Sequence, residues 1–444
     1  MRTEEAMNAR IRCKNKSSKR GSRRPGGNQK ICRSDARQRK RRAGRAFAAE
    51  EAPLIKRILD TIGKLAPKTR KWLVLNISVL AVAMLVQWRG ARSGNGLVTL
   101  SALARTLPLD EDIKMREKRL YRLLDNPHLE GPEMTPLLVR LVLGDHPPRW
   151  VLLVVDQTTI RGVETIMVGV HFAGRVLPVA FTCFEKSKIH KSQNALESTL
   201  LKLVVSSLPT GCKPIFVMDR GYARVSLLQQ LRQLGIPYLV RTKKKVGVWV
   251  DGRKRLVGQL KRRRRPMRYT NILYQGTRKE PVDLVIYHDP DFKEPWFLVV
   301  PPRSSKLLPT EEVVALYRQR MHIELTFRDW KTHLGVRGLR LQVDKAVRLS
   351  RLLLALTAAY ILVLLLGAVP EAVRVRMACE RLRGRPRHGT QRRLSAMTVG
   401  ILMLSLARFA SLARRLLFKI LAALRRGRGG ISLARHQYGE ACPS

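Results

Sequence analysis

The stretch YRQRMHIELTFRDWK, residues 317–331, gathers the residue types that a phosphodiester-breaking site needs. Tyr317, Arg320, Glu324, Arg328 and Lys331 recur there at intervals of three to four residues or their multiples. Each residue of an α-helix turns by about 100°, so these side chains share a stripe about 80° wide. The cations suit an anionic polymer and the carboxylate suits a metal ion. The alternative interpretation is a solvated face that carries weak intrahelical ion pairs.

Two further carboxylates favour the chemical interpretation. Asp156 follows the apolar run Trp150–Val155, and Asp219 follows the run Pro214–Met218. Short continuous apolar runs predict buried central strands, and ligand sites of open α/β sheets lie at the carboxyl ends of such strands. Either Asp taken alone is equally explained as a turn residue or a helix N-cap. Together with Glu324 they form an ordered set of three acids beside a basic helix.

Three carboxylates from separate elements favour hard, oxygen-seeking cations. We therefore predict that Asp156, Asp219 and Glu324 bind Mg²⁺ or Mn²⁺ rather than zinc. Two such ions, about 3.5–4 Å apart, would activate an attacking oxygen and stabilise the leaving oxygen. The sequence shows no P-loop, Rossmann fingerprint or nucleophile elbow, so ATP-driven and acyl-transfer chemistry are not expected.

The chain resembles the bacterial DDE transposases of the insertion-sequence-four family from about residue 90 to residue 366. Four segments carry the resemblance: LLVVDQTTI around Asp156, KSQNALE from Lys191 to Glu197, VMDRGYA around Asp219, and the Tyr317/Arg320/Glu324/Lys331 signature. Met321 departs from the family pattern, which often has an aromatic residue there. Residues 299–302, VVPP, replace a more usual polar continuation.

The resemblance implies a cut-and-paste transposase that cleaves and joins DNA strands at transposon ends. Asp156, Asp219 and Glu324 would be its catalytic triad, and Tyr317, Arg320, Arg328 and Lys331 would contact DNA. The implied partners are double-stranded DNA, as terminal inverted repeats and as target, and a second copy of the chain on that DNA. The implied fold is α/β: a ribonuclease-H-like catalytic core with a β-rich insertion, preceded by a helical DNA-binding region.

Composition and local patterns divide the chain into six predicted segments. Between Asp219 and Glu324, the Asp-Gly turn of VGVWVDGRKRLV and the runs VDLVIYHD and PWFLVV predict strands of the insertion. Earlier, Ala173-Gly174 predicts a hairpin turn. The segments are a basic disordered tail (1–52), a helical DNA-binding region (53–145), the first part of the core (146–241), the insertion (242–302), the last part of the core (303–370) and a basic helical tail (371–444).

The net charge supports a polyanionic partner. Lys and Arg number 86 against 33 Asp and Glu, which gives a formal net charge of +53. Phosphate backbones bind such proteins by counterion release, although an arginine-rich genome would also raise this number. The six scattered cysteines contain no CxxC pair, which indicates a reduced, cytoplasmic protein.

Two alternatives remain from the sequence. A decayed or domesticated element would be a noncatalytic DNA-binding protein with the same basic regions. The apolar run Leu352–Val369 is long enough to cross a membrane, which would make this a membrane-associated basic protein. We expect instead that this run is a buried packing helix and that the protein has no membrane partner, because a nuclease core needs covering helices.

Overall fold

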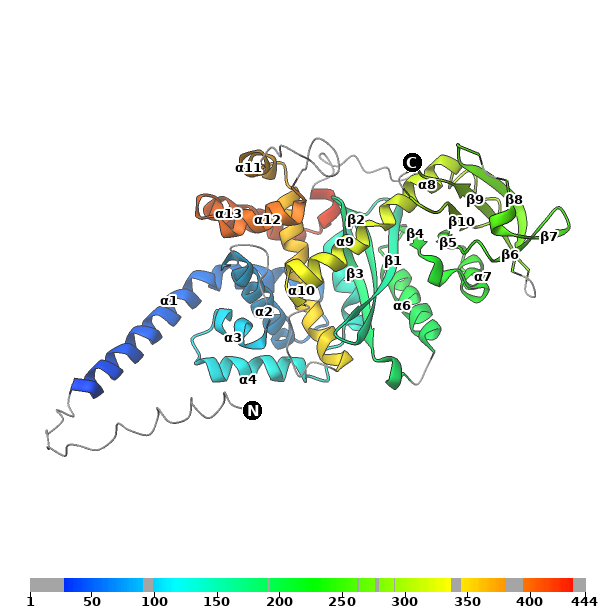
Figure 1. The fold of residues 1–444 in the computed structure, drawn as a ribbon. Helices are drawn as coiled ribbons and strands as arrows, with labels where there is room; N and C mark the ends of the chain where they lie inside the picture. Colours follow the sequence, from blue (N-terminus) through cyan, green and yellow to red (C-terminus); the bar gives the residue numbers. More distant parts are fainter. Residues whose placement is uncertain are drawn as a thin grey trace, which may run out of the picture.

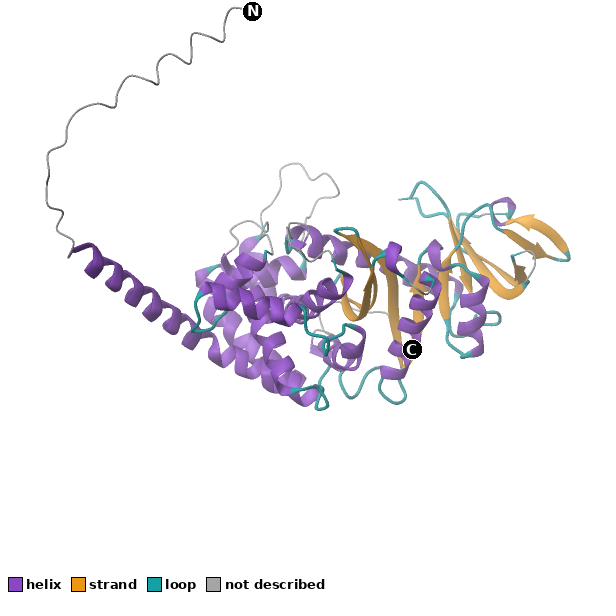
Figure 2. Ribbon diagram, turned by 90° about the horizontal axis from the view of Figure 1, so that it is seen from below, coloured by secondary structure: helices purple, strands orange, loops and turns teal. Residues whose placement is uncertain are grey.

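One mixed sheet of ten strands extends through the molecule and carries helices at one end (Figures 1 and 2). The computed structural model describes residues 28–90, 99–189, 192–261, 263–275, 279–290, 292–336, 345–380 and 394–433. The strand order is β3-β2-β1-β4-β5-β10-β9-β8-β6-β7. The strands are β1 (Trp150–Ile160), β2 (Val163–Phe172), β3 (Arg175–Phe184), β4 (Lys213–Met218), β5 (Tyr238–Arg241), β6 (Gly247–Val250), β7 (Arg253–Leu256), β8 (Met267–Tyr274), β9 (Glu280–Tyr287) and β10 (Trp296–Val300).

The first five strands form a half-sheet whose order is compatible with the predicted ribonuclease-H-like core. β1 pairs antiparallel with β2 and parallel with β4, while β4 pairs parallel with β5. The β2–β3 hairpin turns at Ala173 and Gly174, as predicted, with φ of 51° and 71°. Such positive φ values are typical of a two-residue hairpin turn. The hairpin and the parallel pair thus meet on β1.

The strands of the predicted insertion continue the core sheet. β10 pairs with both β5 and β9, so residues of the insertion and the core share one hydrogen-bonded sheet. The β6–β7 hairpin turns at Asp251-Gly252, as the Asp-Gly signal predicted. The sequence did not single out β8, because its first half, MRYTN, is mostly polar; pairing with β9 and β6 makes it a strand.

The helices fall into two groups (Figure 1). Four flank the sheet near its middle: α6 (Gln193–Ser207), α7 (Val225–Gln233), α8 (Thr310–Arg320) and α9 (His322–Arg328). The others build a helical body: α1 (Asn28–Leu65), α2 (Lys71–Gly90), α3 (Leu100–Thr106), α4 (Ile113–Leu124), α5 (Thr135–Leu143), α10 (Ala346–Ala368), α11 (Ala372–Cys379), α12 (Ala396–Ser405) and α13 (Ala407–Arg425).

The prediction that residues 1–52 are disordered is wrong for the second half of that segment. Residues 28–52 lie within α1, whereas residues 1–27 fall outside the described residues. The helix continues through Leu54 and Ile58, which are buried against the body and give its C-terminal half an apolar anchor. The first fifty residues contain few apolar side chains, which had indicated disorder. Once one part of a helix is anchored, however, each further residue extends it at little cost in free energy.

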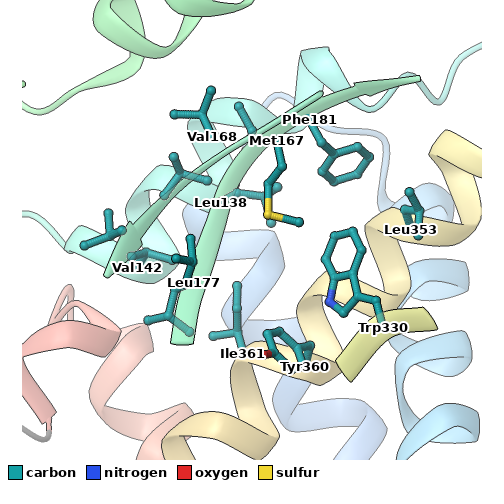
Figure 3. Packing of buried hydrophobic residues seen from close by; sticks show 14 of the residues in the cluster. Leu138, Val142, Met167, Val168, Leu177, Phe181, Trp330, Leu353, Tyr360 and Ile361 are labelled. Carbon is teal, nitrogen blue, oxygen red and sulfur yellow. The ribbon is translucent and has the colours of Figure 1, made fainter. Parts of the chain in front are cut away.

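α10 connects the helical body to the sheet (Figure 3). Its Leu353, Tyr360 and Ile361 are fully buried beside Phe181 of β3, and Trp330 lies between them. The Trp330 ring meets Phe181 edge-on, with centroids 6.5 Å apart, and Tyr360 at 6.3 Å. Edge-to-face contacts of this kind add to the burial energy. The segment after Glu324 is therefore fixed to the core.

α10 is the buried packing helix that the sequence predicted. Within the described residues, α2 and α10 are long and apolar enough to cross a membrane, and the bent pair α12–α13 would be a third candidate by composition. The apolar window of α10 is entirely buried inside the protein, and that of α2 is 67% buried. Gly367 of α10 faces α12 so closely that a Cβ there would lie 1.8 Å from the Ala396 carbonyl oxygen. Helix packing therefore accounts for the apolar character of α10.

Candidate active site

The register of two parallel strands places two carboxylates side by side. Val155 of β1 pairs with Met218 of β4, and these are the last paired positions. The next residues are Asp156 and Asp219. Asp156 does not end its strand, as the sequence analysis had expected, because β1 continues to Ile160 through pairing with β2. Asp156 instead lies where β1 parts from β4, and this is still the carboxyl edge of the parallel pair.

The segment that carries the signature is not one continuous α-helix. α8 ends at Arg320, Met321 separates it from α9, and a π-helical segment follows at Asp329–His333. Around Met321 the backbone bonds tighten to three-residue spacing, from Met321 to Arg318 and from Glu324 to Met321. The ideal azimuths of the sequence analysis are therefore wrong in detail. Glu324 nevertheless faces the same site as Asp156.

Arg320 lies between the first and third acids. Its guanidinium donates to Asp156 Oδ2 and to Glu324 Oε1, each at 2.9 Å. The two nitrogens of one planar guanidinium are about 2.3 Å apart, so these oxygens lie within about 8 Å of each other. The Arg320 side chain is only 4% exposed, whereas that of Glu324 is 53% exposed. Arg320 thus joins the sheet edge to the solvent-facing acid.

Tyr317 connects the second acid to the same cluster. Its hydroxyl donates to Asp219 Oδ1 at 3.3 Å, and its ring lies 5.6 Å from the Arg320 guanidinium carbon. Trp296 of β10 packs edge-on against the Tyr317 ring, with centroids 5.0 Å apart. Burial raises the pKa of Tyr317 to about 12, so the phenol remains a hydrogen-bond donor.

The three acids influence one another's charge. Burial raises the pKa of Asp156 most and the nearby carboxylates of Asp219 and Glu324 also raise it, so that the net value is about 6. The Arg320 guanidinium and the Gln157 backbone N–H, which donates to Asp156 Oδ1 at 2.8 Å, oppose that rise. Burial would lower the pKa of Arg320, but its acidic neighbours raise it overall. The cluster is a set of mutually dependent charges.

Arg328 and Lys331 complete an open cavity over this cluster. The cavity has a volume of about 400 Å³, and Asp156, Glu324, Arg328 and Lys331 all line it. Arg328 and Lys331 therefore share one space with two of the three acids. Lys331 lies inside the π-helical segment Asp329–His333. Their predicted contact with DNA stays a prediction.

The donor set fits a hard divalent cation in chemistry but not in its present spacing. All three side chains offer carboxylate oxygens, the ligands that Mg²⁺ and Mn²⁺ prefer. Among the described residues, however, no three acidic, His or Cys side chains are close enough together to hold one ion. The Arg320 guanidinium fills the space between Asp156 and Glu324. Binding a metal ion there requires this side chain to move aside.

A buried polar network behind the acids was not recognised from the sequence. Glu197 of α6, 2% exposed, forms an ion pair with Arg224 and accepts from Gln193 Nε2 at 2.9 Å. Gln193 Nε2 also donates to the Gln157 side chain at 2.7 Å. Arg224 donates to the carbonyl of Gly221, in the turn after Asp219, at 2.9 Å. The KSQNALE segment that carried part of the resemblance contains both Gln193 and Glu197, and this was the available signal.

Comparison with known protein families agrees with this geometry. Residues 151–362 match the family model described as the transposase DDE domain. The match begins at β1, which carries Asp156, and ends within α10, so it contains all three acids and the whole signature. No curated protein matches the chain. Assignment to the insertion-sequence-four family stays a prediction, whereas the match to residues 151–362 supports a DDE transposase.

Proposed function

We propose that this protein is a cut-and-paste transposase of the insertion-sequence-four type, which cleaves DNA at transposon ends and transfers the freed strand. One observation carries the proposal: Asp156, Asp219 and Glu324 come from three separate elements and converge on the Tyr317–Arg320 pair. A fold has no structural need to gather three acids around one buried guanidinium, whereas phosphodiester cleavage does. The transposase DDE domain match supports the same reading.

Each residue has a role that follows from its position. Two Mg²⁺ or Mn²⁺ ions, held by Asp156, Asp219 and Glu324, would supply Lewis-acid activation of the attacking and leaving oxygens. At neutral pH Asp156 is mainly ionised, since its pKa is about 6. The half-exposed Glu324 carboxylate moves most easily, and Arg320, once released from it, contacts phosphate oxygens. Arg328 and Lys331, which line the same cavity, hold the DNA backbone over the acids.

Basic surfaces beside the cavity favour a long anionic substrate. Arg220, directly after Asp219, lines a second cavity of about 390 Å³ with Arg241 and three consecutive lysines, Lys243, Lys244 and Lys245. Among the described residues that line this second cavity, Glu294 is the one acid. Cations therefore line both this cavity and the cavity over the acids. A strand that passed from one cavity to the other would meet side chains that bind phosphate in each.

In the helical region before the core, we propose that the helix pair α3 and α4 binds duplex DNA. The buried Arg116 side chain holds the turn between α3 and α4, donating to the carbonyls of Arg105, Leu109 and Glu111. The outer face of α4 exposes cations and one aromatic ring: Lys114, Lys118, Tyr121 and Arg122. This face has the chemistry of a groove-binding helix, and we assign transposon-end recognition to it.

The test is strand cleavage by Glu324→Gln. We expect no detectable nicking of DNA with Mg²⁺, because the amide removes a metal ligand, while duplex affinity stays within about twofold. Glu311→Gln, an exposed acid in the first turn of α8, is the matched control and should cleave like the parent protein. Full cleavage by Glu324→Gln would refute the assignment of the triad.

A noncatalytic DNA-binding protein is the second candidate, and the placement of Arg320 between two of the acids favours it. In that case Arg320 is a permanent counterion and no divalent cation enters. Manganese-dependent nuclear relaxation separates the two: Mn²⁺ that binds the parent protein but not Asp156→Asn supports the enzyme. If the parent protein neither binds Mn²⁺ at this site nor nicks DNA, the noncatalytic candidate holds.

A further inference from the structure

Two helices that are far apart in the sequence, α1 and α13, line a basic groove that shares no residue with the cavity over the acids. This groove is a cavity of about 550 Å³, and both helices belong to the helical body rather than to the part of the molecule that holds the sheet (Figure 1). Among the described residues that line it, five are cations and one, Asp60, is an acid. The cations are Lys56, Arg57, Lys64, Arg425 and Arg426.

The contacts between α1 and α13 leave these cations exposed at the surface. The Arg57 guanidinium lies over the Phe418 ring, 4.3 Å from its centre, and Thr61 Oγ1 donates to the Leu421 carbonyl at 3.4 Å. Arg425 is 3.9 Å from Asp60, and both side chains are more than a third exposed. Such a long, exposed ion pair neutralises little charge. The remaining positive charge therefore stays available to a ligand.

A glycine-dependent turn fixes the end of α13 in place. Gly427 has a φ of +84°, and its carbonyl accepts from the Asp145 N–H at 2.8 Å. A Cβ on Gly429 would lie 2.2 Å from the Leu143 carbonyl, so the chain can approach α5 this closely only with glycine there. Arg425 and Arg426 directly precede this turn. Their backbone is thus anchored, unlike that of a charged tail.

We propose that the groove between α1 and α13 binds the sugar-phosphate backbone of a DNA duplex, as a second contact surface apart from the cavity that holds the acids. The proposal rests on the proposed function for the presence of DNA. Five anchored cations against one acid match the regular phosphate charge of a duplex. The polar lining among the described residues is mainly long, exposed cations, which contact phosphate oxygens whatever the base sequence, so we expect binding here to depend on charge more than on sequence. The positive lining favours a polyanion over another basic surface as its occupant, because cations facing cations repel.

The salt dependence of duplex affinity tests this proposal. In the variant Lys56→Gln/Lys64→Gln/Arg425→Gln/Arg426→Gln, four cations are removed and Arg57 keeps its contact with Phe418. The slope of log affinity against log salt concentration should fall by about 3.6 if all four cations contact phosphates, because each phosphate contact contributes about 0.9. Affinity for a duplex of mixed sequence should fall at least tenfold at moderate salt. Unfolding temperature by circular dichroism reports whether the variant folds.

The control removes the same charge elsewhere. Lys202→Gln/Arg303→Gln/Lys306→Gln/Arg374→Gln also loses two lysines and two arginines, all exposed and outside the groove. Its slope should change by less than 1. An unchanged slope in the groove variant, or an equal loss in the control, overturns the groove assignment. Binding is measured without a divalent cation, so a protein that binds duplex through the groove but never cleaves would contradict only the proposed function.

Discussion

The acid cluster and the α1–α13 groove handle charge in opposite ways. At the acid cluster, Arg320 is almost wholly buried and contacts two carboxylates at 2.9 Å. In the groove, cations outnumber acids five to one along the lining, and Arg425 and Asp60 are well exposed. The first region neutralises its charges internally; the second keeps a positive excess at the surface.

The difference shows how one protein can use separate regions for strand cleavage and for the electrostatic attraction of DNA. Buried charges need partners, since removing one partner leaves the other desolvated, and this dependence holds side chains in fixed positions. Surface cations contribute little to stability one by one and are screened by salt, but together they create a field for a polyanion. Mutations should therefore affect cleavage and stability in the first region, and affinity and salt dependence in the second.

Among the variants that compare the two regions, the largest expected effect is on cleavage in Asp219→Asn. The amide oxygen still accepts from the Tyr317 hydroxyl, so the contact at 3.3 Å is kept while the charge is lost. Strand cleavage should fall about 1000-fold, since a lost metal ligand costs several kcal/mol of transition-state stabilisation. Rates of nicking on an end-containing duplex measure this. If duplex affinity fell together with the cleavage rate, the separation of cleavage and binding between the two regions would be contradicted.

Glu197→Gln tests whether the buried network holds the turn after Asp219. Arg224 would lose its carboxylate partner at a 2% exposed position, so the free energy of unfolding should fall by about 3 kcal/mol. Cleavage should fall about tenfold as the Gly221 turn loosens. Chemical denaturation and nicking assays measure both. Glu371→Gln, which removes an exposed partner of Lys419, is the control and should change stability by less than about 0.5 kcal/mol.

The paired rings of His171 and His322 predict an acid-sensitive stability. Burial lowers the pKa of His171 from 6.5 to about 3, and the rings stack with centroids 4.6 Å apart. Between these pKa values the unfolded chain binds a proton that the folded chain does not, so stability is lost as pH falls below 6.5. The loss should reach about 2 kcal/mol by pH 5. His171→Phe should flatten this dependence in denaturation curves; an unchanged dependence would contradict the assignment.

The smallest expected effect is a gain of affinity in Asp60→Asn. This change removes the one acid among the described lining residues of the groove and frees Arg425 from a weak ion pair. Affinity for a mixed-sequence duplex should rise about twofold at low salt and converge with the parent at high salt, because the added attraction is screened. Cleavage should not change. A lower affinity would mean that Asp60 orders the groove.

The sequence by itself determined several strands, two hairpin turns and a buried helix, and it predicted which side chains would share a site. Apolar runs before Asp156 and Asp219 predicted β1 and β4, the Ala173-Gly174 and Asp251-Gly252 turns predicted two hairpins, and the apolar run of α10 predicted a buried helix. These features follow from local rules: residue periodicity, turn conformation and burial of apolar side chains. The Tyr317 signature likewise fixed which cations accompany Glu324.

Only the tertiary structure decided how those residues meet. The position of Asp156 within β1 depends on pairing with β2, and the break at Met321 changes the directions that an ideal helix would give. Arg320 proved to be the buried centre of the acids rather than one cation on a stripe, and α1 joined α13 from the other end of the chain. Long-range pairing and packing set these contacts, because they depend on residues too distant in sequence for any local pattern to record.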